Sequence, residues 1–208
     1  MKLLMLDNYD SFTYNLVQLL KENPTHQVEV RRNNEIDLKE VELYDAIFLS
    51  PGGGLPHEAG LLCPLIEKYA FQKPIFGVCL GMQAIGEVFG AKLFNLAAPL
   101  HGISTPILHQ NTPLFKDLPT TFQVGRYHSW AIETATLSSE FHISATDLNQ
   151  IPMAIEHRDL PLAAVQFHPE SILTEFGREM IDNFLNQVIP LKSKSLQSFH
   201  QQIPFLSH

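Results

Sequence analysis

Apolar and polar residues follow two alternating periods over the first 90 residues of the chain. Short apolar runs, which are typical of buried strands, are separated by segments in which apolar residues recur at helical spacing. We expect Ser11 to cap the first of these helices, because serine is a favoured N-cap residue. The expected strands cover residues 3–6, 27–32, 45–49 and 73–76, and the expected helices lie near residues 12–20, 61–70 and 84–89.

The pattern changes after Gly90, where short β-like runs follow one another with few helical segments between them. Strands that alternate with helices form a parallel sheet covered on both faces. The predicted fold class is therefore α/β, with an open, mostly parallel sheet, helices on both faces and added antiparallel strands. The later strands are expected at residues 121–127, 141–146, 153–157 and 162–167, and a closing helix at residues 176–188.

Composition narrows the possible functions of the chain. The hydrophobic fraction of 45% and charged fraction of 17% in 208 residues are typical of a globular domain. A net charge of −8 argues against nucleic acid or an anionic membrane as the main partner. The two cysteines form no disulfide framework, and the N-terminal apolar run is too short for a signal peptide. We expect a cytoplasmic protein without a membrane span, with one domain at residues 1–189 and a tail at 190–208.

The most informative segment is residues 77–83, which follows an expected strand and precedes an expected helix. Here Cys79 is flanked at both second neighbours by glycine, Gly77 and Gly81. This arrangement is the nucleophile elbow, with sulfur in place of the serine oxygen, and it puts the sulfur at a helix N-terminus that favours a thiolate. Taken alone, Cys79 also fits a small buried hydrophobe, which is our interpretation of the other cysteine, Cys63.

Two more marked segments follow expected strands: the triple glycine at residues 52–54, and residues 168–170. Because parallel strands end at a common edge, we expect both segments to meet Cys79 there. His168 would then transfer the proton, and Glu170, two residues on in an extended segment, would orient its imidazole. Leu80 and the glycine loop would supply backbone N–H groups for an oxyanion.

The same segments allow other interpretations. The triple glycine also fits a simple connector, whereas a phosphate-binding P-loop would need a Lys-Ser/Thr pair that does not follow it. The histidines show no convincing pair at metal-ligand spacing, and His128 is ambiguous in role. We therefore expect neither a metal nor a cofactor.

Four ordered motifs resemble the class I glutamine amidotransferases, the triad glutaminase family. Residues 7–16, 77–83, 127–130 and 168–172 carry the resemblance, which covers residues 1–188. It is closest to the branch that serves anthranilate synthase and aminodeoxychorismate synthase. The resemblance implies hydrolysis of L-glutamine and delivery of ammonia to a separate chorismate-binding synthase subunit. The chain has no second catalytic motif that would consume the ammonia, which favours a separate partner.

The resemblance also implies roles for individual residues. Cys79 would be the nucleophile, with His168 and Glu170 as its partners. The residues implied to contact glutamine or its oxyanion are Gly52, Gly53, Gly54, Leu80, Gln83, Ser129 and Trp130.

The chain departs from the family pattern at two positions and in the tail. Gly53 stands where the family usually has proline, and Ile103 where the branch usually has lysine. The tail has no counterpart in the family. It could dock on the domain or on a partner, or it could fray as chain termini commonly do. Two other functions also stay open: a stand-alone cysteine hydrolase or peptidase, and a non-catalytic scaffold with a vestigial site. The sequence does not distinguish the anthranilate from the aminodeoxychorismate pathway.

Overall fold

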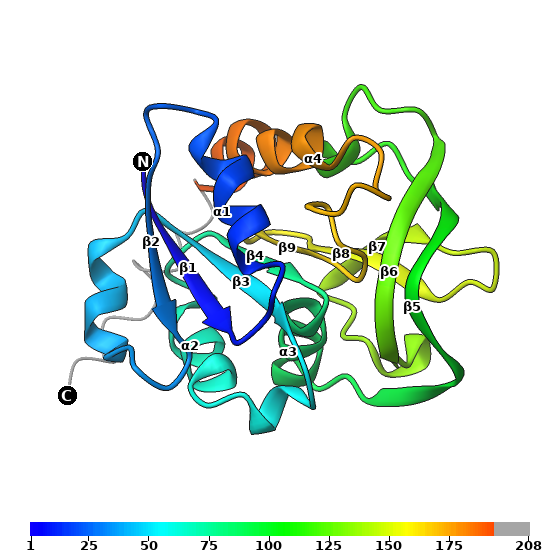
Figure 1. Cartoon of the computed structure of the whole chain (residues 1–208), viewed down its shortest axis with the longest axis horizontal. Helices are drawn as coiled ribbons and strands as arrows, with labels where there is room; N and C mark the ends of the chain where they lie inside the picture. Colours follow the sequence, from blue (N-terminus) through cyan, green and yellow to red (C-terminus); the bar gives the residue numbers. More distant parts are fainter. Residues whose placement is uncertain (194–208) are drawn as a thin grey trace.

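The computed structural model describes residues 1–193, so the predicted tail falls mostly outside the described residues, at 194–208. The described residues form one mixed sheet with helices on both faces (Figure 1). The strands are β1 (Lys2–Asn8), β2 (Gln27–Arg32), β3 (Ala46–Gly52), β4 (Ile75–Val78), β5 (Leu93–His109), β6 (Thr121–Ile132), β7 (Phe141–Thr146), β8 (Pro152–His157) and β9 (Leu162–Val165). The helices are α1 (Thr13–Lys21), α2 (Leu62–Tyr69), α3 (Leu80–Val88) and α4 (Gly177–Asn183), with the π-helical turn η5 (Phe184–Val188) and the 3₁₀ turns η1 (Leu38–Leu43), η2 (Pro56–Glu58), η3 (Pro113–Phe115) and η4 (Thr134–Thr136).

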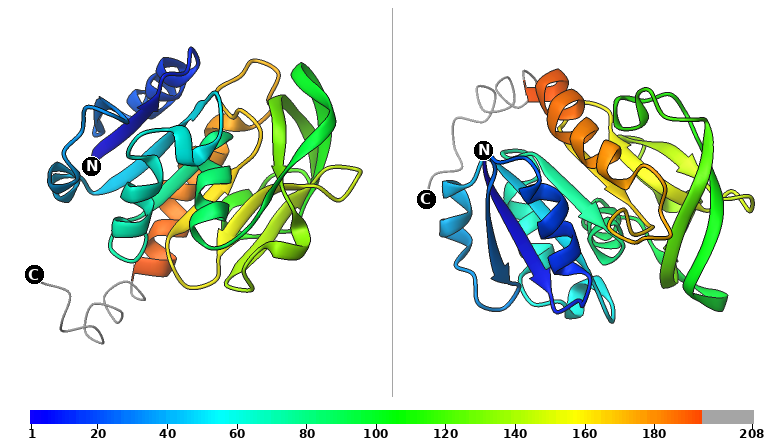
Figure 2. Two further views of the ribbon diagram at one scale, coloured as in Figure 1. Left: turned by 90° about the horizontal axis from the view of Figure 1, so that it is seen from below. Right: turned by 45° about the horizontal axis from the view of Figure 1, so that its top comes forward.

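The sheet has the order β2-β1-β3-β4-β9-β8-β7-β5-β6. In this sheet β2, β1, β3, β4 and β9 run parallel to one another. The sheet then continues with the antiparallel strands β8, β7, β5 and β6. β5 and β6 form a long twisted pair on the side away from β2 (Figure 2). The predicted fold class is therefore confirmed.

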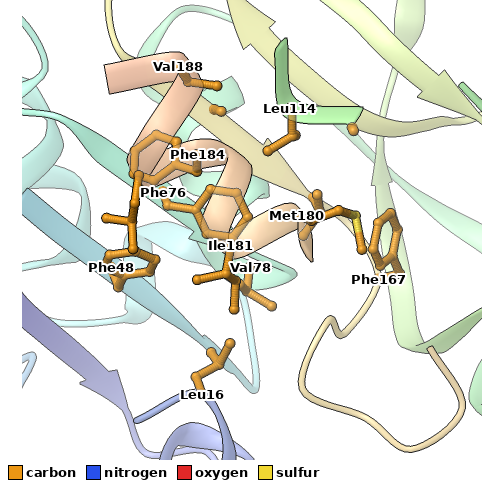
Figure 3. Close-up of a cluster of buried hydrophobic side chains, with 14 of the residues drawn as sticks. Leu16, Phe48, Phe76, Val78, Leu114, Phe167, Met180, Ile181, Phe184 and Val188 are labelled. Atoms are coloured by element: carbon orange, nitrogen blue, oxygen red, sulfur yellow. The ribbon is translucent and has the colours of Figure 1, made fainter. Parts of the chain in front are cut away.

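Four of the parallel strands, β1, β3, β4 and β9, are buried on both faces, whereas β2 at the sheet edge is exposed or half-buried. Alternate residues along β1 enter two separate cores. Leu3 and Met5 pack with α1, α4 and η5, whereas Leu4 and Leu6 pack with α2 and α3. Figure 3 shows the first core, in which the labelled aromatic residues of β3, β4 and η5 lie against one another. Strands covered in this way read as continuous apolar runs, which is the pattern that the sequence shows.

The start of the first helix differs from the prediction. α1 begins at Thr13, and Phe12 rather than Ser11 occupies the N-cap position without a side-chain cap. Two carboxylates fold the preceding turn instead: Asp10 accepts a hydrogen bond from the Phe12 N–H at 2.8 Å, and Asp7 accepts one from the Thr13 hydroxyl at 2.8 Å. The expectation that Ser11 caps the helix was wrong because acidic side chains satisfy this turn.

β5 was not predicted, and β6 extends to Ile132, beyond the expected end at residue 127. Most residues of β5 are exposed or half-buried, so the strand has no apolar face with a period of two. Proline and glycine, which weaken a strand prediction, also occur inside it, and its register with β6 shifts between Asn95 and Leu100 and between His101 and Ile103. Pairing with β6 over its length, rather than burial, holds this strand in the sheet.

Candidate active site

The three segments marked in the sequence leave neighbouring strands. β3 pairs with β4, and β4 pairs with β9, all in parallel. The glycine loop follows β3, Cys79 follows β4, and His168 follows β9, so the three segments meet at the carboxyl edge of the sheet, as the sequence predicts.

Cys79 lies on a sharp turn between β4 and α3, with φ 51° and ψ −101°. A positive φ is strained for a non-glycine residue and recurs at functional turns. A Cβ at Gly77 would lie 2.7 Å from the carbonyl carbon of Gly81, and one at Gly81 would lie 2.8 Å from Leu49 Cβ. Both flanking positions therefore require glycine. The Cys79 side chain is buried at the start of α3, with 5% of its surface exposed.

His168 and Glu170 form a buried pair after β9. His168 Nδ1 lies 2.7 Å from Glu170 Oε1, and the side chains are 2% and 0% exposed. The segment is a turn, with the Ser171 N–H donating to the His168 carbonyl at 3.1 Å, and not the extended segment that was expected. His168 Nε2 is buried without a hydrogen-bond partner among residues 1–193, so it is available for proton exchange.

The environment of His168 favours the imidazolium. Burial opposes its charge, but the interactions with Cys79 and Glu170 outweigh burial and raise the pKa of His168 to about 10, from 6.5. The raised pKa of His168 favours the protonated ring, which can act as a proton donor.

Two aromatic rings fix the position of this imidazole. The ring centroid of Tyr127 lies 4.8 Å from that of His168, and the centroid of Phe12 lies 5.4 Å from it, both at edge-to-face angles. Tyr127 also hydrogen-bonds through its hydroxyl to Ser171 Oγ at 3.2 Å. The sequence marked the motifs that contain these two rings, but it carried no signal that the rings would pack on His168.

The glycine loop lies against the first residue of α3. A Cβ at Gly52 would be 2.6 Å from Leu80 Cδ2 and 2.9 Å from the Asn8 carbonyl oxygen, so this position requires glycine. Gly54 has φ +77°, which glycine adopts without strain. Gly53 is open, because a Cβ there would meet no atom within 4 Å. The loop therefore lies against the side chain of Leu80, the first residue of α3.

Gln83 lies one turn into α3 and is 3% exposed. Its Nε2 donates to the Trp130 carbonyl at 2.9 Å and to Gln166 Oε1 at 3.2 Å. Both N–H bonds of this amide are therefore used within the protein, which leaves its carbonyl oxygen for a substrate. Ser129 and Trp130 lie half-buried near the end of β6.

The structure adds residues that the sequence analysis missed. Gln166 is fully buried, and its Nε2 lies 3.6 Å from Cys79 Sγ. Arg126 and Asp147 form a buried ion pair at 2.7 Å, and Arg126 Nε also donates to His128. The one available signal for Gln166 was a polar residue inside an otherwise apolar run. His128, ambiguous from the sequence, hydrogen-bonds the Trp130 carbonyl at 2.8 Å.

The second cysteine lacks these features. Cys63 is half-buried rather than buried, and burial raises its pKa to about 11, which keeps it as a thiol. Within residues 1–193 no group of His, Cys, Asp and Glu side chains is arranged to hold a metal ion. The same part of the chain contains no helix long and apolar enough to cross a membrane.

Comparison with known families identifies the class of protein to which this fold and site belong. Residues 4–188 match the family model described as glutamine amidotransferase class-I. The chain belongs to the class I glutamine amidotransferase family.

Individual relatives agree with this assignment. Anthranilate synthase component 2 of Azospirillum brasilense is 44% identical over 187 residues, which cover 88% of this chain and 95% of that protein. Aminodeoxychorismate/anthranilate synthase component 2 of Bacillus subtilis is 45% identical over 185 residues, with 88% and 95% covered. A crystal structure of a protein from Thermoplasma acidophilum, assigned to GMP synthase, has a TM-score of 0.80 and 26% identity, and covers 97% of this chain and 96% of that one.

Proposed function

We propose that this chain is the glutaminase subunit of a chorismate-aminating synthase. It hydrolyses L-glutamine through Cys79, His168 and Glu170 and delivers ammonia to a separate synthase subunit. The observation that carries the proposal is the buried pair of His168 and Glu170, 2.7 Å apart, beside the elbow that holds Cys79. The relatives named as component 2 of anthranilate or aminodeoxychorismate synthase support the choice of partner.

The proposed reaction has two stages. The Cys79 thiolate attacks the side-chain amide carbon of glutamine, and an S–C bond forms as the carbonyl oxygen becomes an oxyanion. The C–N bond then breaks, and the proton on His168 goes to the departing nitrogen, which leaves as ammonia. Neutral His168 next takes a proton from water, which attacks the thioester and releases glutamate and the thiolate. Glu170 holds the imidazole and stabilises its charged form throughout.

Backbone groups of the glycine loop and α3 bind the oxyanion in this scheme. The Leu80 N–H is one donor, and an N–H of residues 52–54 is the other, because Gly52 lies against the Leu80 side chain at the same edge of the sheet. Each donor of this kind contributes about 2.7–4 kcal/mol to the transition state.

One side chain and two backbone segments hold the amino-acid end of the substrate in this proposal. Gln83 offers its carbonyl oxygen, because its N–H groups are bound to Trp130 and Gln166. An oxygen acceptor suits the ammonium group of glutamine. The backbone of Ser129 and Trp130, at the end of β6, completes this part of the site together with Gly54.

We assign residues 1–189 to the glutaminase domain and place the protein in the cytoplasm, where free cysteines persist. Binding of the synthase orders the loop at residues 52–54 and raises glutaminase activity, since the open position at Gly53 leaves the loop without a proline constraint. No cofactor takes part in this half-reaction.

Reconstitution tests the proposal. The chain is combined with a chorismate-binding synthase subunit from the same organism, and the aminated products formed from chorismate and glutamine are identified. We expect an amino product with glutamine and labelling of Cys79 by a glutamine analogue that carries a diazoketone in place of the amide. Turnover of peptides or esters without a synthase, with no labelling of Cys79, would overturn the proposal.

A further inference from the structure

Gln166 is a fully buried polar side chain that touches the reacting sulfur. It follows β9 and lies two residues before His168, and its backbone N–H donates to the Met153 carbonyl at 2.8 Å. Its Nε2 lies 3.6 Å from Cys79 Sγ, within the range of an N–H···S hydrogen bond, and its Oε1 lies 3.2 Å from Gln83 Nε2. A buried amide needs partners for both ends, and these two contacts supply them.

The chemistry of the neighbours fixes which end of each amide faces which partner. The Trp130 carbonyl can only accept a hydrogen bond, so the end of Gln83 that lies 2.9 Å from it must be the NH₂ group. The same NH₂ group faces Gln166, so Gln166 must turn its oxygen toward it. The NH₂ group of Gln166 is therefore the end that faces Cys79.

The far end of this chain of hydrogen bonds is anchored by an ion pair. The guanidinium of Arg126 can only donate, so His128 Nε2 accepts from it at 3.0 Å and His128 Nδ1 carries the proton that goes to the Trp130 carbonyl. Burial lowers the pKa of His128 to about 4, which keeps the ring neutral and this arrangement intact. Asp147, 2.7 Å from the guanidinium, holds Arg126 in place. The Trp130 carbonyl is thus held from two sides.

We propose that Gln166 is a further catalytic residue, whose amide N–H donates to the Cys79 thiolate and whose oxygen ties the sulfur, through Gln83, to the Trp130 carbonyl. The inference rests on the proposed function, in which Cys79 is the nucleophile and residue 130 lies at the substrate. Gln166 gives up no proton and forms no bond. Its N–H stabilises the negative sulfur before attack and again when the thioester breaks, at a site where Cys79 is only 5% exposed to water.

Alkylation of the sulfur tests this contact without glutamine. The test uses the full chain with Cys63→Ala, which leaves Cys79 as the only thiol, and follows the rate of iodoacetamide modification against pH. Gln166→Met keeps the length of the side chain but removes the donor. We expect its profile to move to higher pH by about one unit or more, because a hydrogen bond to a charged group is lost. Gln18→Met, an exposed change on α1, is the matched control and should leave the profile in place.

A second measurement uses the wild-type side chain and does not depend on the variant folding. The NMR signals of the Gln166 NH₂ group should change with pH at the same midpoint as Cys79 alkylation, and Cys79→Ala should abolish that change. The proposal is overturned if the Gln166→Met profile coincides with that of the control, or if the Gln166 signals do not respond to Cys79. Because neither readout involves glutamine, a failure of the glutaminase assignment would be seen separately, in the turnover assay.

Discussion

Gly52 packs directly on Leu80, so the glycine loop after β3 and the start of α3 form one surface. A Cβ at Gly52 would lie 2.6 Å from Leu80 Cδ2 and 2.8 Å from Asn8 Cβ, whereas one at Gly53 would meet no atom within 4 Å. Neighbouring glycines therefore have opposite tolerance for a side chain, which allows the oxyanion role of the loop to be tested with matched variants.

Gly52→Ala should force the loop away from Leu80 and misplace the N–H donors. We expect glutaminase kcat/KM to fall by about 10-fold to 100-fold, less than the roughly 100-fold to 1,000-fold effect of losing one oxyanion donor outright, because the donor is displaced and not removed. Gly53→Ala, the matched control, should stay within about twofold of wild type, since the added methyl enters open space. Steady-state glutamine hydrolysis measures both. Equal activity in the two variants would show that the contact between Gly52 and Leu80 does not position the donors.

Gly53→Pro restores the residue that the family usually has at this position. Proline restricts the unfolded chain, and a Cβ at Gly53 would meet no atom within 4 Å, so we expect the free energy of unfolding to rise by about 0.4–1 kcal/mol. Urea denaturation measures the change, with Gly53→Ala as the reference. A decrease in stability relative to Gly53→Ala would mean that the loop backbone does not accept proline.

Glu170→Gln removes the charge beside His168 and keeps the shape of the side chain. The pKa of His168 is raised to about 10 by Cys79 and Glu170 against burial, so its protonation stabilises the fold fully below pH 6.5, and that stability is lost as pH rises through about 10. Without the carboxylate the pKa of His168 should fall, and the alkaline loss of stability should begin at lower pH. Urea denaturation from about pH 7 to pH 10 measures this. Superimposable pH profiles for variant and wild type would contradict the role of Glu170.

His128 has the opposite pH dependence. Burial lowers its pKa to about 4, so the unfolded chain takes up a proton below pH 6.5 that the folded chain does not. Stability should therefore fall as pH drops from 6.5 toward 4, by on the order of 2–3 kcal/mol from this residue. In His128→Gln the loss between about pH 7 and pH 5 should be smaller, as measured by urea denaturation, with exposed His57→Gln as the control. An unchanged acid loss in His128→Gln would show that this histidine is not the source.

Much of the parallel half of the fold could be predicted because burial on two faces leaves a clear apolar signal. The bounds of β2 agree with the prediction, and the loops after β3, β4 and β9 meet as parallel topology requires. In the antiparallel part of the sheet, the bounds of β7 also agree. Cys79 and His168 could be proposed as site residues because a glycine-framed cysteine and a histidine after a strand are local patterns. Their mutual contacts then follow from the strand order.

The remaining features depend on contacts between distant segments. β5 is held by pairing with β6 and has mostly exposed positions, so no local period marks it. Gln166 gains its importance from Cys79, 87 positions away in the sequence, and Gln83. The predicted cap at Ser11 failed because Asp7 and Asp10 organise that turn. β5 and Gln166 depend on residues that are distant in the sequence. At Ser11, neighbouring side chains make the hydrogen bonds that a serine cap would otherwise make.

Cys79→Ala, measured in the complex with the synthase subunit, tests the central claim most directly. Both glutamine-dependent and ammonia-dependent amination of chorismate are assayed, because added ammonia bypasses the glutaminase but still reports on folding and assembly. We predict that glutamine-dependent amination falls by at least about 1,000-fold, as for removal of other catalytic nucleophiles, while ammonia-dependent amination is retained. Glutamine-dependent amination at the wild-type rate in this variant would contradict the account.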